Sequence, residues 1–545
     1  MTRELEKIAR VYGGMNLKKQ RKKRQKLIIK DLCVEYARNS TLHGLRYVTA
    51  SGLTLIEKLF WMSTCLMSVA LCGYFIGNVY QKWTTSPVIV SISEKLVSVN
   101  DVPFPSVTIC PQIKTLSDQY NFSHNINQSI SKNFTFDEYE EDLNKLLDIS
   151  QVCKYNTSLF TSNRNFTDSK MLQNIGMVAP LYPETFDSCY WQNNKVNCNI
   201  FKIVFTAEGL CFNMNGISPN EMFQNTEKEI LSLNSNSIRG WSMETGYSDL
   251  EKDPFPKRGN ENHASPDLEI FLRSREIDRD PLCNGLKSGF EIYLHHPADY
   301  PQSSLYHYSA VNGEVTTLAV SLHAQSTSDS LARYSPDVRQ CYFQSDRYLR
   351  YFKNYTTKNC KAECLSNYTQ EHCGCVGFYM PHDNSSLFCA ENKMDCMRKA
   401  YNKMVQKQLP VELGLDMPVS GCHCLPACES IEYDAEVLKT AFITENFEVQ
   451  RRCHYHGISS SCYYYSLDFE EEYNISKVEI YFKKSQFMSF HRSELFGITD
   501  LLANIGGILD LFLGFSFLSL VEILYFITLR LGVAIRRDIV EEKKK

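Results

Sequence analysis

Two long apolar stretches near opposite ends of the chain constrain its fold more than any other feature. Lys58 and Lys82 enclose 23 residues that carry no charged side chain. About 20 apolar residues are enough for a helix to cross the hydrocarbon core of a bilayer. The stretch begins too far from Met1, and is too long, for a cleaved signal peptide. We therefore expect a first transmembrane helix over residues 59–81.

The second apolar stretch runs from Leu501 to Leu529 and is interrupted only by Asp510 and Glu522. A straight helix of that length, rising about 1.5 Å per residue, would extend roughly 43 Å, more than the ~30 Å core of a bilayer. We therefore expect the second span, within residues 491–532, to be tilted or broken. Carboxylates inside a membrane are costly and usually face a bundle interior or water, where they mark an ion path.

Simpler explanations compete at several of these positions. Glu522 could reach the cytosolic interface, since it lies too far from Arg530 for a helical i to i+4 ion pair. Asp510 could likewise reach the outer interface. Small residues such as Gly514 and Ser516 could serve only to bring helices together, and this is the reading we favour for the GxxxG pair in the first span, Gly73 and Gly77.

Charged residues predict the orientation. Lys and Arg crowd the segment before the first span, including the run KKQRKKRQK at residues 18–26, and return after the second span. By the positive-inside tendency, residues 1–58 and the tail 533–545 lie in the cytosol and residues 82–490 lie outside. The basic run could also be a nuclear signal, but the neighbouring span favours a juxtamembrane role. A formal net charge of −4 gives no support for nucleic-acid binding.

The segment between the spans has the features of an extracellular domain. Eighteen of the 21 cysteines lie there, an even number that suits disulfides in an oxidising compartment, whereas Cys33, Cys65 and Cys72 are expected to be free thiols. A zinc site at Cys422–Cys428 is possible but less favoured than crosslinks. The segment also holds nine N-x-S/T glycosylation sequons, at Asn121, Asn127, Asn133, Asn156, Asn165, Asn354, Asn367, Asn384 and Asn474.

Secondary structure in this segment is predicted to be mixed. We expect a short helix at 137–148, a loop around Tyr334–Pro336, and exposed loops over the polar region 212–285. Ten cysteines between positions 341 and 428 suggest a rigid stalk of helical hairpin and loop. Apolar or alternating runs predict strands at 86–92, 102–110, 200–206, 291–295, 314–322 and 476–482.

The chain resembles the degenerin and epithelial sodium channel superfamily, and within it the insect pickpocket channels. His43-Gly44 alone is a chance-level dipeptide, but the ordered set of motifs with two spans and the cysteine ladder is specific. The motifs are FPSVTICP (104–111), GLCFNMN (209–215), YSPDVRQC (334–341), NCKAEC (359–364), CGCVGFYMP (373–381) and GGILDLFLGFSFLSLVE (506–522).

This resemblance implies a membrane protein with two transmembrane helices and a large disulfide-rich α+β ectodomain, built on a β-sheet palm with finger, thumb, knuckle and β-ball. It implies a trimeric plasma-membrane channel, homomeric or formed with related subunits, that prefers sodium, is blocked by amiloride and is gated through the ectodomain by an unidentified stimulus. Sodium would be the permeant ion, with no cofactor, structural metal or catalytic residue.

Disulfide pairing is also implied by the resemblance. Cys453 and Cys462 are close enough in sequence for a hairpin clamp, which leaves Cys153 to pair with Cys283. The pairs implied by the family are Cys110–Cys211, Cys189–Cys198, Cys341–Cys428, Cys360–Cys424, Cys364–Cys422, Cys373–Cys396 and Cys375–Cys389.

The resemblance assigns roles to residues of the pore. Gly514, Phe515 and Ser516 fall on the family's G-x-S selectivity filter, and His43-Gly44 falls on its gating motif. Asp510 stands where relatives often have Gly, which suggests stronger attraction of divalent cations. The acid-sensing relatives have Trp at the position of Val338, so the resemblance does not extend to the way they couple ectodomain to pore. Ala503 falls at the family's degenerin position. The residues expected along the pore and gate are Ala503, Asp510, Leu511 and Glu522.

Other functional classes fit less well. A non-conducting receptor or adhesion glycoprotein would explain the sequons and cysteines, but not the polar interruption of the second span. An ATP-gated trimeric channel shares the topology and differs in its cysteine pattern. We find no GxSxG elbow, HExxH, P-loop or dinucleotide fingerprint, so an enzyme is the least supported class.

Overall fold

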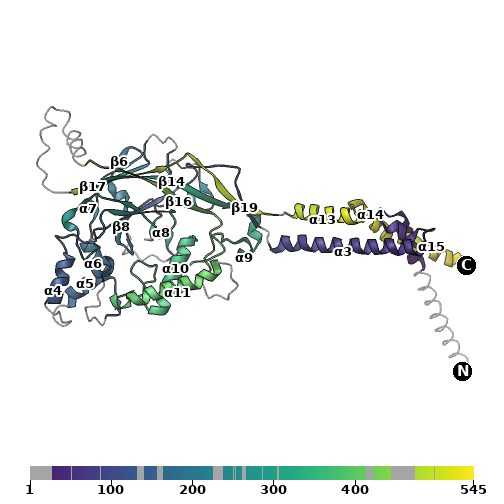
Figure 1. The fold of residues 1–545 in the computed structure, drawn as a ribbon, viewed down its shortest axis with the longest axis horizontal. Helices are drawn as coiled ribbons and strands as arrows, with labels where there is room; N and C mark the ends of the chain where they lie inside the picture. Colours follow the sequence, from purple (N-terminus) through teal and green to yellow (C-terminus); the bar gives the residue numbers. More distant parts are fainter. Residues whose placement is uncertain are drawn as a thin grey trace, which may run out of the picture. The chain divides into compact units, whose positions relative to one another are not determined.

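A computed structural model of the chain (Figure 1) divides it into two compact units. The helical unit comprises Met1–Ile89 with Glu494–Lys545, and the disulfide-rich domain comprises Val90–Ser493. The structure describes residues 27–50, 52–85, 88–131, 140–155, 164–224, 237–248, 251, 253–260, 265–284, 286–302, 306–412, 422–443, 473–495 and 497–544.

An eight-stranded sheet forms the larger part of the disulfide-rich domain. Its strands run in the order β1-β19-β14-β17-β11-β5-β6, and β16 pairs with β14. Strand β14 lies parallel to both β17 and β19 and antiparallel to β16. The bounds are β1 Val88–Ile92, β5 Phe186–Trp191, β6 Asn194–Val196, β11 Leu268–Arg275, β14 Glu314–Thr327, β16 Ser430–Ala441, β17 Tyr473–Phe482 and β19 Ser489–Glu494.

A second sheet of five strands packs against the first and shares its core. The strands run in the order β13-β12-β3-β8-β7. Phe104, Phe212, Ile270, Leu318 and Phe482 are all fully buried in one apolar cluster that draws on both sheets. The bounds are β3 Ser106–Pro111, β7 Lys202–Thr206, β8 Gly209–Met214, β12 Phe290–His295 and β13 Tyr308–Ala310.

Helices form two groups beside the sheets (Figure 1). The first group consists of α4 Phe122–Ser131, α5 Glu140–Cys153 and α6 Lys170–Val178; the second consists of α10 Thr357–Cys373 and α11 Met394–Glu412. The side chain of Thr356 caps the start of α10 by accepting from the Asn359 N–H, and Gly374 ends it in a left-handed conformation. Short elements complete the domain: α7 Tyr182–Thr185, α8 Pro219–Met222, α9 Pro336–Arg339, β2 Val97–Ser98, β4 Phe166–Thr167, β9 Trp241–Ser242, β10 Gly246–Tyr247, β15 Phe388–Cys389 and β18 Gln486–Phe487, with single 3-10 turns at Cys198–Ile200, Glu276–Asp278, Asp329–Arg333 and Glu391–Lys393.

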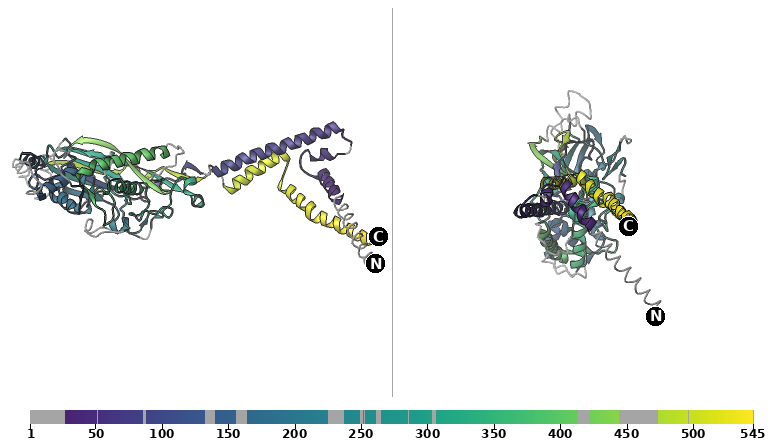
Figure 2. Two further views of the ribbon diagram at one scale, coloured as in Figure 1. Left: turned by 90° about the horizontal axis from the view of Figure 1, so that it is seen from below. Right: turned by 90° about the vertical axis from the view of Figure 1, so that its right-hand side faces the viewer.

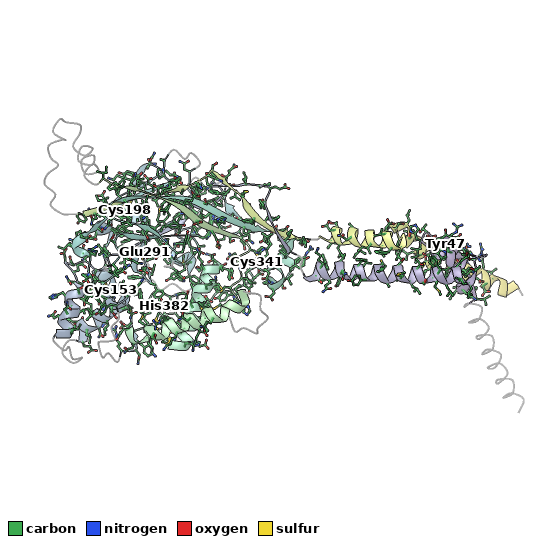
Figure 3. All side chains as sticks on the ribbon, viewed as in Figure 1. Tyr47, Cys153, Cys198, Glu291, Cys341 and His382 are labelled. Atoms are coloured by element: carbon green, nitrogen blue, oxygen red, sulfur yellow. A yellow bond between two sulfur atoms is a disulfide. The ribbon has the colours of Figure 1, made fainter. Side chains whose placement is uncertain are left out.

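Eight disulfides crosslink the described part of the disulfide-rich domain; Figure 3 labels Cys153, Cys198 and Cys341, one cysteine from each of three bonds. Seven are the pairs that the family resemblance implies. The eighth joins Cys153 to Cys283, as elimination predicted. Cys453 and Cys462 lie outside the described residues, as does the basic run 18–26. Cys422, Cys424 and Cys428, the candidate zinc ligands, all form disulfides.

The helical unit contains one unbroken long helix, α3 Leu55–Thr85, and a second helical stretch that is interrupted. Helix α13 Ile498–Leu513 lies along α3 (Figure 2). The rings of Phe75 and Phe512 are stacked between them, with 5.6 Å between centroids. Beyond the break follow α14 Phe517–Tyr525, a π-helical turn Phe526–Arg530 and α15 Leu531–Lys544. Before α3 come helical residues 27–39 and α2 Leu45–Thr49.

Two stretches among the described residues are long and apolar enough to cross a bilayer, Leu55–Thr84 and Phe517–Asp538. Each predicted strand overlaps an observed one, and the helix predicted at 137–148 is observed as α5. One expectation was wrong. The polar region 212–285 contains β11, a central strand of the large sheet, because Leu268, Ile270 and Leu272 alternate into the core. Tyr334 and Ser335 are non-helical, as predicted, and α9 begins at Pro336, whose fixed φ suits a first helical position.

Candidate pore site

The interruption in the second apolar stretch falls at Gly514–Ser516, the positions that the resemblance assigned to the selectivity filter. Gly514 ends α13 with φ 62° and ψ 31°, a left-handed conformation that favours glycine. Its N–H donates to the Asp510 carbonyl oxygen over 2.8 Å, and the Phe515 N–H donates to that of Leu509 over 3.3 Å. These bonds satisfy carbonyls at the helix end and turn the backbone out of helical geometry.

Ser516 and Ser519 restart the helix on the other side of the break. Ser516 is extended, with φ −103° and ψ 171°, and its Oγ accepts from the Ser519 N–H over 3.3 Å. In return the Ser516 N–H donates to the Ser519 Oγ over 3.2 Å. This reciprocal arrangement is a capping box, which gives α14 its own start rather than a continuation of α13.

The segment before α2 reaches this break from the other end of the chain. The His43 N–H donates to the Leu513 carbonyl oxygen over 3.0 Å, at the last residue of α13. A Cβ added to Gly514 would lie 2.3 Å from the His43 Nδ1 atom, so only glycine leaves room for this ring. Gly44 follows in a left-handed conformation of its own, with φ 84°. The two motifs singled out from the sequence therefore meet in space.

Ser519 is a functional candidate that sequence reasoning missed. Its side chain is 1% exposed, and its Oγ lies 2.8 Å from the Thr41 Oγ1, which links the N-terminal segment to α14. Thr41 also donates to the Glu522 Oε2 over 3.4 Å. The sequence did contain a pattern that could have identified it: Ser516 and Ser519 lie three residues apart at the start of an apolar run, which is a form of the capping box.

One face of α13 carries small residues and a single carboxylate. Residues 503, 507, 510 and 514 recur at intervals of four, three and four, so Ala503, Gly507, Asp510 and Gly514 form one stripe along the helix. Phe512 lies on the opposite face, against α3. The first three members of the stripe are exposed and Gly514 is half-buried.

The remaining predicted pore residues are less closely tied to this stripe. Leu511 is 79% exposed and lies beside the stripe rather than in it. Glu522 is half-buried beyond the break and faces Thr41. It does not pair with Arg530, whose guanidinium instead lies 2.6 Å from the Glu35 carboxylate.

Seven of the nine sequons fall on described residues of the disulfide-rich domain. Asn133 and Asn156 lie outside the described residues. Asn354 and Asn474 are half-buried, and the remaining five side chains are exposed: Asn121, Asn127, Asn165, Asn367 and Asn384.

A family model described as amiloride-sensitive sodium channel matches residues 36–526, which spans both apolar stretches and the whole region between them. The chain belongs to this family. Its members are subunits of multimeric ion channels, not enzymes, and the resemblance noted from the sequence is confirmed. The two terminal spans and the disulfide-rich α+β ectodomain agree with this family fold.

Curated relatives align with nearly the whole chain. Pickpocket protein 28 of Drosophila melanogaster is 27% identical over 92% of this chain and 79% of its own length. The bile acid-sensitive ion channel of Mus musculus is 22% identical over 91% of this chain and 87% of its own. Acid-sensing ion channel 1 of Gallus gallus is 20% identical over 90% of this chain and 82% of its own.

Proposed function

We propose that this chain is a pore-forming subunit of a sodium-preferring, amiloride-sensitive cation channel in the plasma membrane. Three subunits, identical or related, surround the pore, and both termini lie in the cytosol. The observation that carries the proposal is the stripe of small residues and one carboxylate on α13, which ends in a break at Gly514 on the face opposite α3. A helix that packed only against lipid and a neighbour would need neither the stripe nor the break.

Cation selectivity follows from the stripe and the break together. Three Asp510 carboxylates around one axis would attract cations and repel anions, because low-dielectric walls focus their field. Backbone carbonyls freed from a helix inside a bilayer must face water, ions or protein rather than lipid. The non-helical residues Gly514–Ser516 can present such carbonyls to a dehydrating sodium ion.

Gating would act through the N-terminal segment. His43 is bonded to the last residue of α13, and Thr41 contacts both Ser519 and Glu522 on α14. A displacement of residues 41–44 would remove contacts on both sides of the break at once. The His43-Gly44 pair could therefore change the conformation of the filter through these contacts.

The test is expression in oocytes, alone and with related subunits, under protons, peptides, small organic ligands, osmotic change and force. We expect a cation current whose reversal potential follows sodium more closely than potassium, which amiloride reduces and which a Gly514 substitution alters at constant surface expression. Surface protein that carries no current under any stimulus or partner would instead favour a non-conducting receptor.

A further inference from the structure

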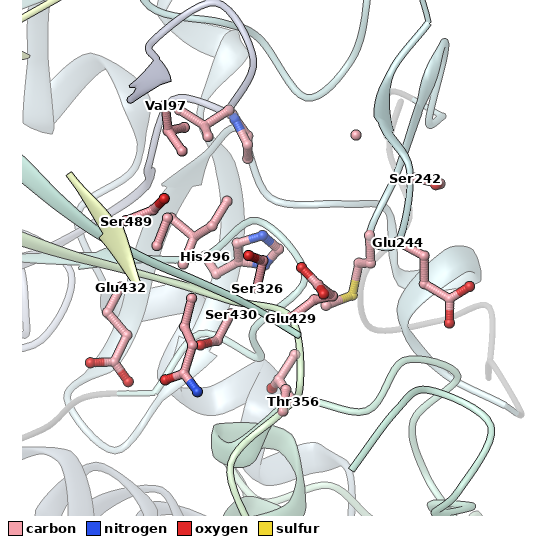
Figure 4. Close-up of a pocket in the computed structure, with 18 of the residues that line it drawn as sticks. Val97, Ser242, Glu244, His296, Ser326, Thr356, Glu429, Ser430, Glu432 and Ser489 are labelled. Carbon is pink, nitrogen blue, oxygen red and sulfur yellow. The ribbon is translucent and has the colours of Figure 1, made fainter. Parts of the chain in front are cut away.

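A cavity of about 320 Å³ lies among residues of the disulfide-rich domain and takes no part in the proposed pore (Figure 4). Its walls are the ends of strands β14 and β16, the hairpin 241–246 and the first turn of α10. Ser489 of β19 also lines it. Cavities of this size and mixed lining are typical of small-molecule sites.

His296 directs a hydrogen-bond donor into this cavity. The side chain is 8% exposed, and its Nδ1 accepts from the Ala298 N–H over 3.2 Å, which leaves the proton of a neutral ring on Nε2. Burial lowers the pKa of His296 to about 4, so the ring is neutral at pH 7. Within the described part of the chain, Nε2 has no hydrogen-bond partner. The ring is largely buried, but Nε2 is not fully enclosed, so a ligand or water in the cavity can accept its bond.

The charge around the cavity is negative. The Glu429 Oε1 accepts from the Thr327 N–H over 2.9 Å. Burial raises the pKa of this carboxyl, and repulsion from Asp329 and Glu244 adds to the effect. The lining cation Lys358 lies 3.2 Å from Asp299 and is neutralised by it. Two further lining acids, Asp101 and Glu432, are exposed.

Apolar surface completes the lining. The Trp241 ring lies 5.8 Å from that of His296, centroid to centroid, and Met243, Val97 and Val102 are among the other lining residues. An aromatic face beside carboxylates attracts a cation that carries an apolar body.

We propose that this cavity binds a small organic cation, with its ammonium group at Glu429 and Glu244, its apolar body against Trp241, and an acceptor atom on the His296 Nε2–H. Attraction of the cation offsets the repulsion between the two carboxylates, and the acceptor satisfies the unpartnered donor. An anion would not offset the repulsion between the carboxylates, and a purely apolar ligand would offer neither a positive charge nor an acceptor for the His296 donor.

Ligand binding in the cavity could affect the pore through the chain itself. This coupling rests on the proposed function. The cavity is lined by β14, β16 and Ser489 of β19, and the chain continues from β19 into α13. A ligand that holds these three strands together would bias the strand that leads into the pore helix.

The test measures binding directly, so that it does not depend on current. Purified full-length protein in lipid nanodiscs is titrated calorimetrically with tyramine, which has an ammonium group, an aromatic body and a phenolic oxygen. Tyrosol, in which a hydroxyl replaces the ammonium, is the matched ligand. We expect Glu429→Gln, and tyrosol with the wild-type protein, each to weaken binding about tenfold or more, as loss of a charge-assisted contact predicts.

Glu371→Gln is the matched control, because Glu371 is exposed on α10 and does not line the cavity; its binding should equal that of the wild type. If Glu429→Gln fails to fold, Glu244→Gln on the exposed hairpin replaces it, with an expected loss of at least threefold. Absence of saturable tyramine binding to folded wild-type protein, or equal binding of tyrosol, would overturn the proposal. Tyramine binding without any current would leave this site standing and count against the proposed channel.

Discussion

Arg492 of β19 donates from Nη1 to the Gln340 carbonyl oxygen over 2.9 Å, and the same nitrogen lies 3.2 Å from the carbonyl oxygen of Arg339. Arg492 is 8% exposed, and its own carbonyl oxygen accepts from the Ser328 N–H over 2.8 Å. Val338, in the same turn, is 37% exposed and makes none of these contacts. The strand that leads to α13 is therefore joined to this turn by hydrogen bonds from the Arg492 guanidinium to main-chain carbonyl oxygens, not through a side chain at position 338.

Replacing Arg492 should loosen this junction. Arg492→Met leaves two carbonyl oxygens without their buried donor, which costs about 1–3 kcal/mol. We expect a lower unfolding temperature for the purified protein and faster hydrogen exchange at residues 336–341. Arg398→Gln is the control, since Arg398 is an exposed cation whose ion pair with Asp395 contributes little. Unchanged exchange in Arg492→Met would show that the junction is held by other contacts.

Gly514→Ala should abolish or strongly reduce current at normal surface expression. The added Cβ would collide with the His43 ring, and alanine at positive φ costs a further ~1–2 kcal/mol. His43→Ala in the same chain removes the collision but not the backbone strain, so we expect partial rescue of current per surface channel. Gly532→Ala is the control, because nothing lies within 4 Å of that added Cβ and Gly532 belongs neither to the break nor to the GxxxG pair. A lack of any rescue would mean that the His43 contact is not what requires glycine.

Asp510→Asn should weaken block by calcium and reduce calcium permeation. The substitution keeps the shape of the side chain and removes one charge from each subunit. Loss of about 1.4 kcal/mol of attraction corresponds to roughly tenfold weaker block. The measurement is the calcium dose-response of the sodium current, and Asp510→Glu should retain the block. Identical calcium sensitivity of the wild type and Asp510→Asn would place this carboxylate outside the ion path.

Ala503→Phe should raise the resting sodium current severalfold. Ala503 lies on the stripe with Asp510, where a large ring would prevent the helices from closing around the axis. Leu502→Phe is the control, because position 502 lies about 100° away around the helix. Resting current is compared at matched surface expression. Equal currents for both variants would contradict the assignment of this stripe to the pore.

The disulfide-rich domain should lose stability in acid below about pH 6.5. Burial lowers the pKa of both His295 and His296 from 6.5 to about 4, with a smaller contribution from Lys358. Between these values the unfolded chain binds more protons than the folded one, so stability is complete above pH 6.5 and falls as the pH approaches 4. Each histidine contributes a slope of at most about 1.4 kcal/mol per pH unit.

Thermal unfolding across that pH range measures this effect. The double variant His295→Gln with His296→Gln should show a flatter dependence, whereas His124→Gln, on exposed α4 surface, should follow the wild type. A double variant with the full wild-type slope would assign the acid sensitivity to other groups.

Local patterns predicted much of this architecture. The apolar runs indicated two spans, and the excess length of the second indicated a tilt or a break. Strands β12, β14 and β17 were recognisable because their side chains alternate or form continuous apolar runs. Strand β11 was missed because its alternation is short and is surrounded by polar residues, so that the composition of the region concealed it.

By itself the sequence determined where the chain can enter a bilayer, because that depends on local composition. It also determined which cysteines pair, through the family motifs, and where a helix must stop, through the conformations open to glycine and serine. Only the tertiary structure decided that Thr41 meets Ser519, 478 residues away, and that His43 fills the space beside Gly514. The donor of His296 and the carboxylate of Glu429 meet at one cavity for the same reason. Packing brings such distant groups together, and no local periodicity records it.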